Sequence, residues 1–210
     1  MKHWNFCLFA LVLIFSASPL FAGSIPYANA GTVAATVTTY ATTSQGIDLY
    51  YYGSTAGYTD YIGVYDVQTG YNSGLLFDNK TTAVGTEDVV GAIAGEIDAG
   101  DQLIFYIDSP EGIFASLAAD SADGTNHAYT TSYVGGTVNN VAIPAGLFIG
   151  MEDENKSHSD LNYNDEDFTV TGASTSAVTP EPQSIFLFGS GLVLLIAFGR
   201  SRRASAIREG

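Results

Sequence analysis

The densest group of side chains that could bind a ligand or take part in a reaction is an acidic stretch at residues 152–167. It starts with Glu152-Asp153-Glu154, continues through a polar loop, and ends with an Asp- and Asn-rich run from Asp160 to Asp167. Carboxylates held this close repel one another unless a cation or solvent screens them. Ca²⁺ takes about six to eight oxygen ligands from carboxylates, amides and backbone carbonyls. We therefore expect a calcium site with the following ligands: Glu152, Asp153, Asp160, Asn162, Asn164 and Asp165.

The spacing excludes a helical calcium-binding hand. Asp160, Asn162 and Asn164 have the 1-3-5 spacing of such a loop, but Asp165 stands where the turn glycine belongs and Thr171 where the bidentate Glu belongs. A calcium loop on a β-scaffold remains open. The competing interpretation is a solvated acidic hairpin, with Tyr163 and Phe168 packed into a core.

The same residues resemble the end of a domain of unknown function, the one numbered 4114. Its members carry Phe-Glu-Asp followed by Asp-x-Asp-Tyr-Asn-Asp-x-x-Phe. Here Met151 replaces the first Phe and Asn162 replaces the middle Asp. The turn Asp98-Ala99-Gly100-Asp101 ahead of Leu103–Tyr106 is similar to the glycine turn of that family. The resemblance implies a surface β-domain, open to calcium dependence, and implies no reaction.

The C-terminal segment combines three features in a fixed order. Pro180-Glu181-Pro182 precedes an uncharged apolar run of 15 residues, 185–199, and Arg200, Arg202 and Arg203 follow. Proline cannot continue a helix, the run is shorter than the roughly 20 residues of a spanning helix, and arginines tend to stay on the cytoplasmic side.

This order resembles the PEP-CTERM sorting signal of Gram-negative surface proteins. The resemblance implies recognition by an exosortase in the inner membrane and cleavage near Pro-Glu-Pro. One departure from the family is the cytoplasmic tail, 204–210, which is longer than usual there. The alternative is a plain transmembrane anchor.

The N-terminus predicts a secretory signal peptide, and hence signal peptidase as a partner during export. Lys2 precedes an apolar core at 6–15, and small residues follow. We expect cleavage after Ala22, with Ala30 as the alternative. The protein would then be an inner-membrane-anchored precursor that ends at the cell surface or outside the cell. Its β-domain would span 23–172, and 173–179 would be a linker.

Charge and cysteine content exclude several classes of function. Residues 23–179 hold 2 lysines, no arginine and 20 acidic residues, which gives a formal charge of −18. Such a surface repels nucleic acid, which we exclude as a partner. The only cysteine, Cys7, lies in the signal peptide, so the mature domain has no disulfide.

The body of the chain predicts an all-β fold, an antiparallel β-sandwich or jelly-roll, flanked by an N-terminal signal helix and a C-terminal hydrophobic helix. Short β-branched and aromatic segments alternate with turns rich in Gly, Asn and Asp. The expected strands are 32–40, 47–52, 61–67, 74–77, 89–97, 102–107, 113–119, 128–134, 138–143, 146–151 and 168–171, with a helix open at 89–97.

We expect a non-catalytic protein with a structural or adhesive role in exopolysaccharide or biofilm. No nucleophile elbow occurs, and only His127 and His158 remain after processing. The alternative is a module that binds or cleaves surface polysaccharide. A groove lined by Tyr50, Tyr52, Tyr61 and Tyr65 would favour binding, and a deep pocket with two separate carboxylates would favour cleavage.

Overall fold

The computed structural model describes residue 25 and residues 27–176. The signal peptide, the signal helix and the whole sorting segment 180–203 lie outside the described residues. Within them, the regular structure is β apart from one short 3-10 helix, η1 (Ala118–Asp120), and all strand pairs are antiparallel. The all-β antiparallel prediction is confirmed. In the described part of the chain, no helix combines the length and apolarity needed to cross a membrane.

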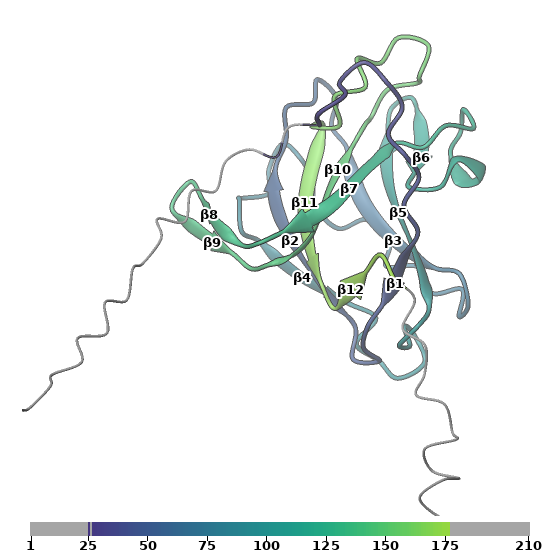
Figure 1. The fold of residues 1–210 in the computed structure, drawn as a ribbon, viewed down its shortest axis with the longest axis vertical. Coiled ribbons are helices and arrows are strands. Elements are labelled where there is room, and N and C mark those ends of the chain that lie inside the picture. Colours follow the sequence, from purple (N-terminus) through teal and green to yellow (C-terminus); the bar gives the residue numbers. More distant parts are fainter. Residues whose placement is uncertain (1–24, 26, 177–210) are drawn as a thin grey trace, which may run out of the picture.

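The first sheet has β5 at its centre (Figure 1). β5 (Gln102–Ser109) pairs with β3 (Tyr61–Asp66) along one edge. Its other edge pairs with β1 (Thr39–Ala41) near its start and with β6 (Gly112–Ala115) near its end. β12 (Ala173–Ser174) then pairs with β1, so the sheet extends two residues into the segment expected to be a linker.

The second sheet has the order β4-β2-β11-β10-β7. Its strands have the following bounds: β4 Glu87–Val90, β2 Ile47–Gly53, β11 Glu166–Thr171, β10 Gly146–Met151 and β7 Ala128–Tyr133. The register between β2 and β11 shifts between Asp167 and Phe168: Asp167 pairs with Gly53 and Phe168 with Tyr51, so the extra residue, Tyr52, lies on β2.

The two sheets share one apolar core. Alternating residues of β5, Leu103, Phe105 and Ile107, are buried, as period-2 alternation predicts. They belong to the same cluster as Phe168 and residues of β2 and β10. The Phe105 and Phe168 ring centroids, one from each sheet, lie 5.6 Å apart.

The opposite face of the second sheet is also covered. The hairpin of β8 (Gly136–Val138) and β9 (Val141–Ile143) extends beside it (Figure 1), and Ile143 packs with Tyr52 and Phe148. The single strand expected at 138–143 is wrong. Asn139 and Asn140 have φ of 50° and 66°, and two such residues form a tight hairpin turn.

Four other expected strands differ from the structure. Of the strand expected at 32–40 only the end forms, as β1, and the strand expected at 113–119 ends at Ala115, before η1. Residues 74–77 form no named strand, although Leu76 N–H donates to Ile62 O at 2.8 Å, so the segment runs beside β3. The expected strand or helix at 89–97 ends at Val90, because Gly91 and Gly95 adopt positive φ and turn the chain.

Antiparallel pairing gathers the ends of several strands at one end of the sheets. Met151 pairs with Glu166 in one sheet, and Tyr61 pairs with Asp108 in the other. Ser109 Oγ at the end of β5 donates to Asp153 O after β10, which brings these two sets of strand ends together. The loop 152–165 lies here, at the upper end in Figure 1. The fold therefore concentrates acidic loop residues at this end.

Candidate metal centre

Three carboxylates converge at the end of β10. Ligand atoms of Glu152, Asp153 and Asp165 all lie within 4.8 Å of one another. Glu152 and Asp153 are 1% and 2% exposed. These three residues, which we call the outer triad, were all among the six predicted ligands.

Backbone hydrogen bonds hold the outer triad. Glu152 N–H donates to His127 O at 3.0 Å, which continues the β10–β7 pairing, and Asp165 N–H donates to Met151 O at 3.1 Å. Asp153 N–H donates to Asp165 Oδ2 at 3.1 Å, and Tyr163 N–H donates to Glu152 Oε2 at 3.2 Å. The three carboxylates are thus fixed by the end of the sheet.

In the loop before Asp165, residues with buried side chains alternate with residues that line the site. Leu161 and Tyr163 have φ of 50° and 56°, a costly conformation for large residues, and both side chains are buried. The Tyr163 hydroxyl donates to Asn126 O and accepts from Ala34 N–H. A Cβ on Gly150 would lie 2.2 Å from Tyr163 O, so only glycine lets the loop lie against β10.

The other three predicted ligands line the same hollow as the outer triad. Asp160, Asn162 and Asn164 face a polar cavity of about 360 Å³, which Thr55 and Glu154 also line. Asp160 Oδ2 accepts from Asn162 Nδ2 at 2.6 Å, and Asn164 Oδ1 accepts from Thr55 Oγ1. All six predicted residues therefore share one cavity, with Glu152, Asp153 and Asp165 as its closest group.

Sequence reasoning missed Asp60, Asn79 and Glu166. Asp60 and Glu166 are fully buried, and the electrostatic influence of Asp60 and Asp153 reaches Glu166. Glu166 follows Asp165 in the sequence. Its spacing of two residues from Phe168 predicts that both side chains lie on the core side of one strand. No local pattern connects Asp60, which precedes β3, with residues a hundred positions later.

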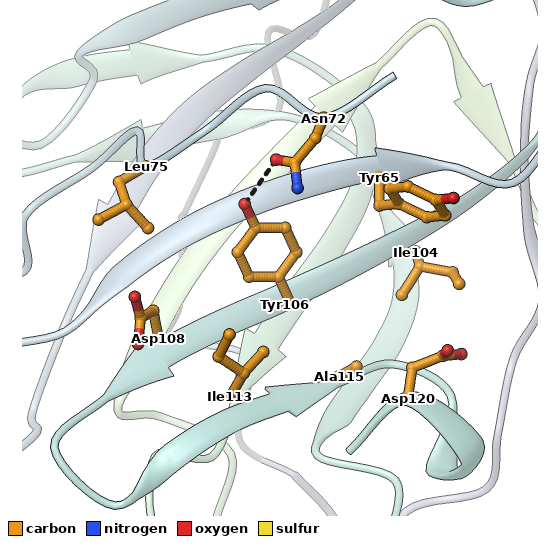
Figure 2. Close-up of a pocket in the computed structure, with 9 residues that line it drawn as sticks. All are labelled: Tyr65, Asn72, Leu75, Ile104, Tyr106, Asp108, Ile113, Ala115 and Asp120. Carbon is orange, nitrogen blue, oxygen red and sulfur yellow. Dashed lines mark hydrogen bonds between the residues drawn. The ribbon is translucent and has the colours of Figure 1, made fainter. Parts of the chain in front are cut away.

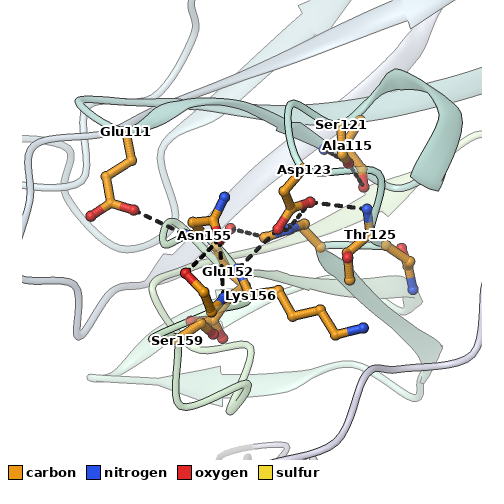
Figure 3. A network of polar contacts seen from close by, with 12 residues as sticks. Glu111, Ala115, Ser121, Asp123, Thr125, Glu152, Asn155, Lys156 and Ser159 are labelled. Carbon is orange, nitrogen blue, oxygen red and sulfur yellow. Dashed lines mark hydrogen bonds and ion pairs between the residues drawn. The ribbon is translucent and has the colours of Figure 1, made fainter.

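Cationic side chains do not neutralise this group. Among the described residues, the ion pairs are His127 with Asp123 and His158 with Glu111. Figure 3 shows the network around Glu152, in which Asp123 accepts from the Lys156 and Thr125 backbone N–H groups. The ammonium group of Lys80, which is exposed, donates a hydrogen bond to Ala56 O.

The carboxyl pKa values reflect this environment. Burial, together with the negative charge of Asp165, raises the pKa of Glu152 to about 7. Burial and Asp60 raise that of Asp153 to about 7, and burial and the charge of Asp153 raise that of Asp165 to about 7. Burial and the charges of Asp60 and Asp78 raise the pKa of Glu166 to about 9. Oxygen-only ligands of this kind suit a hard cation such as Ca²⁺.

These shifts predict a pH-dependent stability without metal. A carboxyl with a raised pKa binds more protons in the folded state than in the unfolded state, so stability is full below the unfolded pKa and falls as pH rises through about 6 to 9. In EDTA, thermal denaturation should give a falling melting temperature from pH 5.5 to 8.5. Asp165→Asn should flatten the decline, and exposed Asp98→Asn should not. A melting temperature that rises over this range would contradict the account.

Comparisons with known proteins complete the description of the site. The chain matches no protein-family model, no curated protein and no solved structure.

Proposed function

We propose that the protein is an exported, non-catalytic β-sandwich that binds Ca²⁺ and has a structural or adhesive role at the cell surface. The sandwich assignment is supported by the core that both sheets share. Strands β1 to β5 alternate between the two sheets, a connectivity that jelly-rolls also use.

The convergence of Glu152, Asp153 and Asp165 carries the calcium proposal. Three carboxylates within 4.8 Å, in a polar cavity that also offers Asn162 and Asn164, provide the carboxylate and amide oxygens that Ca²⁺ prefers. Zn²⁺ prefers His or Cys ligands, and no such side chain belongs to the outer triad. A bound ion would hold the 152–165 loop against the sheets.

The non-catalytic assignment is supported by the surroundings of His127. Its ring is fully buried and stacks on Phe114 at 4.2 Å. Nδ1 faces Glu152 O and Nε2 faces Asp123, so both nitrogens already have partners. This histidine is placed to support the fold rather than to accept a proton from a substrate.

Calcium should raise the melting temperature of the protein at neutral pH. An ion at about 100 times its Kd adds about 2.7 kcal/mol, and a domain of this size gains roughly 2–4 °C per kcal/mol, so we expect a rise of about 5–10 °C. Asp165→Asn should remove most of the rise, whereas the matched exposed variant Asp98→Asn should keep it. A wild type with the same melting temperature in EDTA and in millimolar Ca²⁺ would refute the calcium proposal.

The cell-surface assignment rests on the terminal segments and their resemblance to a signal peptide and a PEP-CTERM tail. Removing the tail would take Arg200, Arg202 and Arg203 away and leave a strongly anionic product. This anionic product would remain soluble outside the cell and would attract divalent cations.

Mass spectrometry of the protein from its native host tests this assignment. We expect an N-terminus at Gly23, or at Gly31 for the later cleavage, and a C-terminus near Pro180. A chain that retains Arg203 would instead identify the segment 185–199 as a permanent anchor.

A second candidate function is glycan binding on the outer face of the first sheet. The four tyrosines whose alignment along one groove would favour binding are not aligned: Tyr52 is buried, and Tyr50 lies with it on β2, while Tyr61 and Tyr65 lie on β3. Tyr65 instead lines a hollow of about 260 Å³ with Tyr106 (Figure 2). The other lining residues are Asn72, Leu75, Ile104, Asp108, Ile113, Ala115 and Asp120.

The hollow combines aromatic faces with polar groups that can bind sugar hydroxyls. Tyr106 donates to Asn72 Oδ1 at 2.8 Å, and Asp108 and Asp120 add acceptors (Figure 2). The two carboxylates disfavour acidic sugars. Neutral glycans are therefore the favoured ligands of this candidate.

An array of neutral oligosaccharides tests the second candidate. Tyr65→Ala should weaken binding by roughly two- to tenfold, because an aromatic contact is worth about 0.5–1.5 kcal/mol. Tyr58 is the matched control, since both tyrosines are 37% exposed. An equal effect of Tyr58→Ala, or no binding by the wild type, would rule out the hollow as a glycan site.

A further inference from the structure

Six buried carboxylate oxygens have no hydrogen-bond partner in the described part of the chain, and two of them belong to Asp66 and Asp167. The other four are Asp60 Oδ1, Asp153 Oδ2 and both Oε atoms of Glu166. The three residues are 0%, 2% and 0% exposed. We propose that Asp60, Asp153 and Glu166 form a second, inner site for a divalent cation such as Ca²⁺, and that Asp153 bridges it to the outer triad.

The three inner residues come from both sheets. Asp60 precedes β3 of the first sheet, whereas Asp153 follows β10 and Glu166 begins β11 of the second. Strand alternation places Glu166 on the same side of β11 as Phe168, which faces the shared core. An ion here would join the two sheets directly at their open end.

Asp60 and Asp153 are already oriented. Asp60 N–H donates to Asn79 Oδ1 at 3.1 Å, and Asn79 Nδ2 donates to Asp60 Oδ2 at 2.8 Å, which leaves Oδ1 available. The Asp153 backbone is held from both sides, since its N–H donates to Asp165 and its C=O accepts from Ser109 Oγ at 2.7 Å. The carboxyl groups of Asp60 and Asp153 also lie within hydrogen-bonding reach of each other, where one ion could bind both.

A shared proton could join Asp60 to Asp153, but protonation does not satisfy Glu166. A proton would remove the charge of Glu166 but would create an O–H donor that also needs an acceptor, and neither Glu166 oxygen has a partner among the described residues. A divalent cation satisfies several oxygens at once and cancels charge.

The amount of charge also favours two ions. The outer triad and the inner residues together hold five carboxylates, since Asp153 belongs to both. One divalent ion would offset two of the five negative charges, and two ions would offset four. Lys80, the cation whose charge acts on Asp60, is exposed and bonded to Ala56 O.

Counting bound ions tests the inner site, which rests on the proposed calcium function because the two sites share Asp153. Equilibrium dialysis of the exported protein against ⁴⁵Ca²⁺ should give two ions per chain for the wild type. Glu166→Gln should give one, Asp165→Asn should give one, and Asp98→Asn should retain two. In EDTA, Glu166→Gln should melt no lower than the wild type, which would separate lost binding from lost folding.

The outcomes distinguish the two proposals. One ion in the wild type, unchanged by Glu166→Gln, would overturn the inner site and leave the calcium function standing. Two ions that survive Glu166→Gln would also overturn it. No bound ion in the wild type would overturn both proposals.

Discussion

The repulsion among buried carboxylates at one end of the two sheets is the constraint on which the rest of the account depends. Glu152, Asp153 and Asp165 converge within 4.8 Å, and fully buried Asp60 and Glu166 act electrostatically on the same group. Charges out of water need partners, and an isolated buried carboxylate takes up a proton or a cation instead. In the described part of the chain, histidine partners bind Asp123 and Glu111, outside this group.

The apolar core is what keeps the carboxylates together despite their repulsion. Phe105 and Phe168 join the sheets, and the β10–β11 ladder fixes Met151 opposite Glu166 immediately beside the site. Tyr163 anchors the intervening loop through its buried hydroxyl, and Gly150 leaves room for it. Because the scaffold already holds the ligands in place, the free energy of ion binding should add directly to the free energy of unfolding. Such coupling suits a chain that has a single cysteine and therefore no internal disulfide.

The sequence predicts much of the fold and part of the site. Leu103, Phe105 and Ile107 recur at every second position, which predicts β5, because the side chains on one face of this strand pack into the shared core. The composition of 152–167 predicts the outer ligands because they are close in sequence. Asp60 could not be predicted, because only tertiary packing brings it to Asp153. The Asn139-Asn140 turn, in contrast, is a local signal that favours a hairpin over the single strand expected at 138–143. The sorting residues Pro180–Pro182 lie outside the described residues.

A crystal structure of the protein grown with Ca²⁺ tests the central claim most directly. Anomalous scattering should place one ion at about 2.3–2.6 Å from oxygens of Glu152 and Asp165, and a second at the same range from Asp60 and Glu166, with Asp153 bound to both. The carboxylate positions should otherwise match those described above. A well-ordered map without an anomalous peak at this end of the sheets, at millimolar Ca²⁺ and pH above 8, would contradict the account.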